Sequence, residues 1–159
     1  MILVMDDYVH CFMSYLIHLP VVTLSSPLFQ LATAHTLSAL TCPAPETSLI
    51  CLDTLALLSQ RLSHAETHPR LQPIFQQYGK AILSLTLAGV FQGFPEDGLD
   101  QVQRVVAATV SCAPPAEVEG WVSEALNEIP GHVVPSGEKQ TFLRELHECV
   151  FCAISSMTV

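Results

Sequence analysis

The chain has 159 residues, of which half are apolar and 13% are charged, and 6 basic residues against 15 acidic ones leave a formal charge of −9. This is the length of one domain, so we expect a single folded region over residues 1–159, with 149–159 as an atypical C-terminal tail. The negative charge argues against direct binding to nucleic acid or to an anionic membrane surface, and it suits a basic protein ligand.

Breaks in the hydrophobic pattern divide the chain into about seven segments of helical length. The first is predicted over residues 2–19 and is closed by Pro20, which cannot continue a helix. The second is predicted to start at Ser25 or Ser26 as N-cap, with Pro27 in its first turn, and to end at Leu40. Their core-facing stripes are predicted as Tyr8, Cys11, Phe12, Tyr15 and Leu19, and as Leu28, Leu31, Ala32, His35 and Ala39.

The third and fourth segments are predicted over residues 46–62 and 70–91, on either side of a polar loop at 63–69. The fourth is apolar nearly all round after Tyr78, a pattern that is typical of a helix buried on most sides. The core-facing residues of the third are predicted as Leu49, Leu52, Ala56 and Ser59, with Leu55, Leu58 and Leu62 beside them.

The fifth segment is predicted over residues 99–111, the sixth follows the double proline at 114–115, and the seventh starts with Ser136 as its cap. Their predicted stripes are Val102, Val105, Val106 and Thr109, then Val118, Trp121, Val122, Ala125 and Ile129, then Phe142, Leu146, Cys149, Val150 and Ala153. No segment shows the alternation of a β-strand, so we predict an all-α fold.

The segments also pair in a regular order. Starts near residues 2, 46 and 98, with partner helices near 26, 70 and 115, give a repeat of roughly 44–52 residues, against about 40–47 in HEAT-type repeats. Pairs of this kind bury both faces only by stacking, which also explains the low share of charged residues. The predicted fold is an α-solenoid of antiparallel HEAT-like helix pairs. A compact seven-helix bundle would account for the helices equally well, but not for the spacing.

One long stretch raises the question of a membrane span. Residues 8–45 carry no Asp, Glu, Lys or Arg, and about 20 apolar residues are enough to cross a bilayer. A small helical membrane protein is therefore the alternative function class. Pro20, the break at 25–27 and several polar residues interrupt the stretch, and no basic residue precedes it to set a topology. We therefore expect buried helices and no membrane association.

Signatures of catalysis and cofactor binding are missing from the sequence, which has no Gly-rich phosphate loop, no G-x-S-x-G and no H-E-x-x-H. We predict neither an enzyme nor a cofactor, because an α-helical enzyme with an unfamiliar site would need a cluster of coupled titratable groups. His147, Cys149 and Cys152 could suggest a metal site with His132, but a structural zinc site takes four ligands, usually from paired elements. Small core residues are the plainer interpretation, and the six cysteines are expected to be reduced and mostly buried.

Three acidic residues, Glu117, Glu124 and Glu128, recur at i, i+7 and i+11 along the edge of the Trp121 stripe. One interpretation is a solvated helix face. The other is an acidic, cargo-facing edge, because the second helix of each pair usually lines the concave side of a solenoid. A basic protein cargo is the partner that this edge predicts.

Four stretches in a fixed order carry a resemblance to a known family. They are SYLIHLPVVTLSSPLFQLAT at 14–33, QQYGKAILSLTLAGVFQGFPEDGLDQVQRVV at 76–106, WVSEALNEIPG at 121–131 and GEKQTFLRELHE at 137–148, and Asp6–Asp7–Tyr8 opens the first helix. These stretches resemble the C-terminal HEAT repeats of an importin-beta-type karyopherin, of the transportin-SR and importin-13-like branch. The likeness covers about residues 5–148 and lies in packing patterns rather than in catalytic signatures.

The resemblance implies a nuclear transport receptor that shuttles between cytoplasm and nucleus and imports RNA-binding, Ser/Arg-rich cargo under control of the GTPase Ran. In that superfamily the main Ran-binding surface and the Arg-rich cargo helix lie in upstream repeats that this chain lacks, so none of their residues is carried over. We expect a fragment of a longer solenoid, because the chain begins inside a helix and its last residues, CVFCAISSMTV, do not form the polar cap of a solenoid end.

Overall fold

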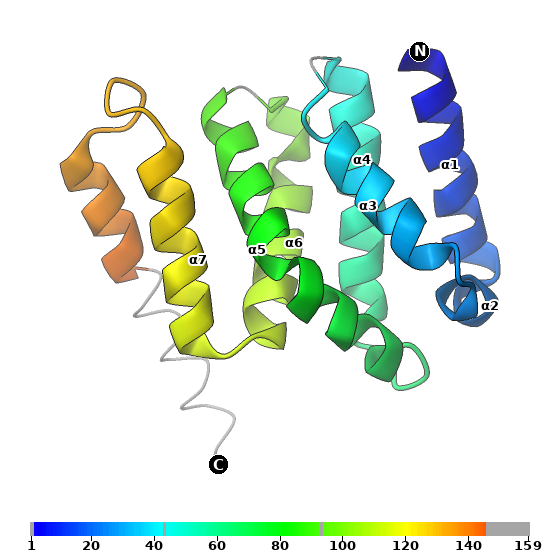
Figure 1. Ribbon diagram of the computed structural model, residues 1–159. Coiled ribbons are helices and arrows are strands. Elements are labelled where there is room, and N and C mark those ends of the chain that lie inside the picture. The colour runs from blue at the N-terminus through cyan, green and yellow to red at the C-terminus, as the bar shows by residue number, and fades with distance from the viewer. Residues whose placement is uncertain (1, 43, 93, 146–159) are drawn as a thin grey trace.

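The protein is described by a computed structural model over residues 2–42, 44–92 and 94–145, with side chains from Asp6 onward except at position 92. All regular structure in these ranges is helical, which confirms the predicted all-α class. In chain order the helices are α1 (Ile2–His18), α2 (Pro20–Ser25), α3 (Phe29–Ala39), α4 (Pro45–Arg61), α5 (His68–Gln92), the short 3-10 helix η1 (Glu96–Gly98), α6 (Leu99–Cys112) and α7 (Pro115–Glu128), followed by a helix at 136–145 (Figure 1).

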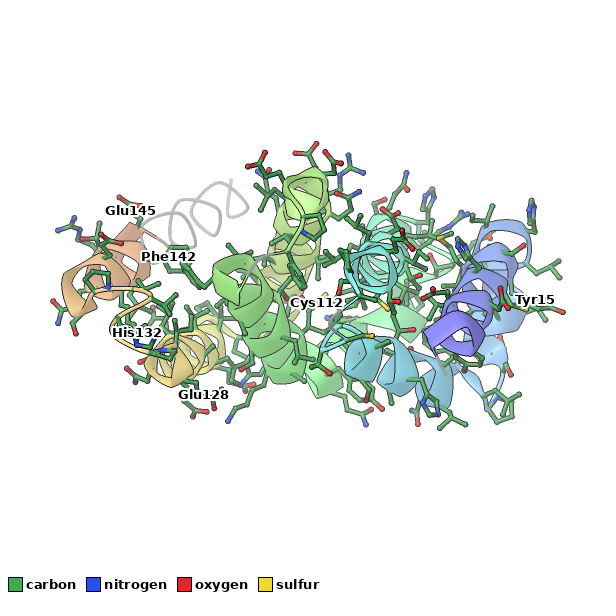
Figure 2. All side chains as sticks on the ribbon, turned by 90° about the horizontal axis from the view of Figure 1, so that it is seen from above. Tyr15, Cys112, Glu128, His132, Phe142 and Glu145 are labelled. Carbon is green, nitrogen blue, oxygen red and sulfur yellow. The ribbon has the colours of Figure 1, made fainter. Side chains whose placement is uncertain are left out.

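The long helices form two layers. α1, α4 and α6 lie side by side in one layer, since α4 contacts both of the others, and α3, α5 and α7 lie side by side in the other, since α5 contacts both of its neighbours. Successive long helices run in opposite directions and alternate between the layers (Figure 1). The described helices thus lie in a row, with α1 at one end and the helix at 136–145 at the other (Figure 2). Taken in chain order, the long helices are grouped below as the pairs α1/α3, α4/α5 and α6/α7.

α4 and α5 lie at the centre of the row and contribute side chains to its core. Leu52, Leu55 and Leu58 of α4 are at most 1% exposed and belong to a core cluster that extends from α1 to α6. A second cluster joins Leu83 and Leu87 of α5 to the inner stripe of α7. The predicted stripe of α7 is confirmed, because Val118, Val122, Ala125 and Ile129 are buried and Trp121 is half-buried.

Three of the buried threonines satisfy their hydroxyls within their own helices. Thr33, Thr54 and Thr109 each donate a hydrogen bond to the carbonyl four residues earlier, at 2.8–3.0 Å. Such a bond lets a polar side chain sit between helices without a partner on the neighbouring helix. The threonines among the apolar positions therefore do not interrupt the packing between layers.

The first two predicted helices, which correspond to α1 and α3, do not bury the predicted faces. From Asp6 to the end of α1 the buried residues are Val9, Phe12 and Leu16, whereas four of the five predicted core residues are exposed: Tyr8, Cys11, Tyr15 and Leu19. In α3 the prediction is right for Ala32 and Ala39 and wrong for three exposed residues: Leu28, Leu31 and His35. Because both helices are apolar on more than one side, the sequence period alone does not select the face that packs against α4.

The structure corrects two further expectations. Pro20 follows the end of α1 and is also the first residue of α2. The N–H of a first helical residue has no partner inside the helix, so proline, which lacks this group, is well suited to the position. Phe142, a predicted core residue of the last helix, is 36% exposed. The other predicted core residues of that helix, Leu146, Cys149, Val150 and Ala153, lie outside the described residues, as does the predicted tail at 149–159.

In the described part of the chain, no helix combines the length and the hydropathy that crossing a bilayer requires. α1 has 17 residues, and α2 and α3, which follow it, have 6 and 11.

Candidate protein-interaction surfaces

An apolar groove opens on the outer side of the first helix pair, the side that faces away from α4 and α5. Its volume is about 410 Å³, and all ten lining residues are uncharged: Tyr8, Cys11, Phe12, Tyr15, Val22, Thr23, Ser26, Leu28, Phe29 and Ala32. The buried rings of Phe12 and Phe29, with centroids 6.0 Å apart, belong to both the groove and the core. We call this surface, with the adjacent exposed Leu19 and Leu31, the N-terminal face.

Exposed apolar side chains are concentrated around this groove. Of the eleven large hydrophobic residues that are exposed in the described part of the chain, eight lie between residues 8 and 31. Tyr15 is 55% exposed and Leu28 is 67% exposed, and Figure 2 shows Tyr15 at the outer end of the row. An apolar patch of this kind marks an interaction surface more often than scattered single residues do.

Local hydrogen bonds hold the helices that frame the groove. The Thr23 hydroxyl donates to the Leu19 carbonyl at 2.8 Å, and the Leu28 N–H donates to the Ser26 hydroxyl oxygen at 3.2 Å, so these two hydroxyls bond to nearby backbone. The ring of Tyr8 stands edge-on to His35 of α3, with the centroids 5.9 Å apart. The groove is therefore a formed feature of α1, α2 and α3, in which the Thr23 and Ser26 hydroxyls are already hydrogen-bonded.

The predicted acidic edge lies on α7. Glu117, Glu124 and Glu128 are all exposed, and Figure 2 shows Glu128 pointing outward from the layer of α3, α5 and α7. With a rise of about 1.5 Å per residue, the first and last of these carboxylates are spaced by about 16 Å along the helix. The structure thus places the three predicted residues along one helix, on the solvent side.

A lysine from the neighbouring helix partly neutralises this edge. Lys80 of α5 forms an ion pair with Glu124. The hydrogen bond to Glu124 and the charge of that carboxylate raise the pKa of Lys80, Glu128 adds to the rise, and a small loss of hydration opposes it. The sequence pattern does not reveal the role of Lys80, because Glu124 lies 44 positions further along the chain and the contact forms only when α5 packs on α7.

Two of the described thiols, those of Cys51 and Cys112, are buried. Cys51 is fully buried, and burial, with smaller contributions from Asp6 and Cys42, raises its pKa to about 12. Burial also raises the pKa of Cys112, although a hydrogen bond with Ser111 opposes the rise. A thiol that stays protonated is a poor nucleophile and a poor metal ligand near neutral pH.

Within the described ranges, no group of three or more His, Cys, Asp or Glu side chains could hold a metal ion. Of the four residues considered for a metal site, His132 is exposed, and the other three, His147, Cys149 and Cys152, lie outside the described residues. The expectation that the cysteines are mostly buried is right for Cys51 and Cys112 and wrong for Cys11, which is exposed on the N-terminal face.

Comparisons of the chain with protein-family models, with curated proteins and with solved structures give no match. The two surfaces described above are therefore the starting point for a functional proposal.

Proposed function

We propose that the chain is a protein-binding scaffold of stacked HEAT-type helix pairs and forms a C-terminal part of an importin-beta-type nuclear transport receptor. Its partner is a basic, Ser/Arg-rich RNA-binding cargo that the receptor carries from cytoplasm to nucleus. Ran binding belongs to other repeats of such a receptor, and the proposal includes no catalytic step and no cofactor.

One observation carries the scaffold part of the proposal. The pairs α1/α3, α4/α5 and α6/α7 follow one another in chain order, and each contacts the next in both layers. The interval from Ile2 to Pro45 has the length of one HEAT-type repeat, about 40–47 residues, and the next, from Pro45 to Leu99, is longer because α5 has 25 residues. Stacked pairs of this kind provide extended surfaces for partners.

The charge pattern supports a basic cargo. A formal charge of −9 creates a field that attracts cationic segments. On the outer surface of α7, Glu117, Glu124 and Glu128 offer carboxylates at a spacing that an extended Arg-rich segment can follow, and arginine pairs well with carboxylates. Lys80 occupies one of these carboxylates, so it competes with the cargo for Glu124.

The test is binding of a fluorescent Ser/Arg-repeat peptide to the whole chain at low salt, measured by anisotropy. We expect Lys80→Ala to tighten binding about 2- to 5-fold, since the exposed ion pair that it removes is weak. The triple variant Glu117→Gln, Glu124→Gln, Glu128→Gln should weaken binding about tenfold or more. The peptide should be used with and without serine phosphorylation, because phosphate changes its charge.

The matched control variants carry their substitutions on or just before α6, which lies in the layer of α1, α4 and α6. Arg104→Ala changes the net charge as Lys80→Ala does, but at an exposed position of α6. Glu96→Gln, Asp97→Asn and Asp100→Asn together remove three exposed carboxylates near the start of α6. The cargo assignment fails if the peptide does not bind, or if the variants on α6 change its affinity as much as those on α5 and α7.

A further inference from the structure

We draw no further inference here: the strongest candidate, the apolar groove on the outer side of α1, α2 and α3, is where further repeats would pack under the proposed function, and nothing in the described part of the chain shows what covers it.

Discussion

Gly79 of α5 lies against the indole of Trp121 of α7. A β-carbon added at Gly79 would stand 2.6 Å from the indole Cζ3 and 3.3 Å from Cγ2 of Thr109. The absence of a side chain at this position therefore allows the tryptophan of one helix to approach the backbone of its neighbour. The half-buried indole of Trp121 is thus covered on one side by the backbone of α5 at Gly79.

Gly79→Ala should destabilise the protein. Overpacking costs about 1–3 kcal/mol, and the better helix propensity of alanine offsets about 1 kcal/mol of that loss. Gly120→Ala is the control, because Gly120 lies inside α7 with nothing within 4 Å of an added β-carbon, and it should stabilise by about 0.5–1 kcal/mol. Urea denaturation of both variants measures the difference, and opposite signs are expected. Equal effects would mean that the Trp121 contact does not restrict position 79.

Because of Cys51, the free energy of unfolding is expected to fall as the pH becomes alkaline. Its pKa in the folded protein, about 12, lies above the value of 9.0 for a thiol outside the protein. The unfolded chain therefore loses its proton first as the pH rises. The stabilisation from this thiol is complete below pH 9 and is lost progressively as the pH rises toward the folded value.

The corresponding experiment compares the natural chain with Cys51→Ala. Between about pH 8 and about pH 10.5, the free energy of unfolding should fall more steeply for the natural chain than for the variant, because only the natural chain ionises this thiol on unfolding. Other groups that titrate in this range affect both proteins and cancel in the difference. Parallel pH profiles for the two proteins would show that the thiol does not titrate differently in the two states.

At the scale of elements, α1 is attached to α4 by apolar packing and by one hydrogen bond between side chains. The hydroxyl of Thr47, which is 1% exposed, donates to Asp6 Oδ1 at 2.6 Å. Because the acceptor is a carboxylate, this bond is of the stronger, charge-assisted kind. It also holds the start of α1 in place while the opposite side of that helix forms the N-terminal face.

Thr47→Val should cost about 1–2 kcal/mol of stability, because valine keeps the shape of threonine but leaves Asp6 without this donor. Thr54→Val is the matched control on the same helix: Thr54 is also buried, but its hydroxyl donates only to the Ile50 carbonyl of its own helix, so the change should be close to neutral. Hydrogen exchange should show faster exchange of α1 amides in the Thr47 variant and unchanged exchange in α6. A loss at position 54 as large as that at position 47 would contradict this role of the bond.

Across the whole molecule, the described helices form a row of pairs with different ends. The acidic edge lies on α7, and the charge-free N-terminal face lies on α1, α2 and α3 at the opposite end (Figures 1 and 2). The acidic edge and the N-terminal face therefore lie far apart on the same chain.

The sequence by itself determined the helical class, the breaks between the helices from α3 onward, and the buried stripes of α4 and α7. In these helices polar or charged residues mark the outer side, so the 3.6-residue period identifies the inner side. It also predicted the acidic edge as three exposed carboxylates on one helix, since their spacing follows from helix geometry.

Only the tertiary structure decided which side of α1 and α3 is buried. Residues 8–45 contain no charged side chain to mark an outer face, and packing on α4 and α5 selected Val9 and Leu16 over Tyr15 and Leu28. The same is true of the Lys80–Glu124 ion pair and the Thr47–Asp6 bond, whose partners are 44 and 41 residues apart. Periodicity reports which residues share a side of a helix, but the neighbour that covers this side is set by contacts between distant parts of the chain.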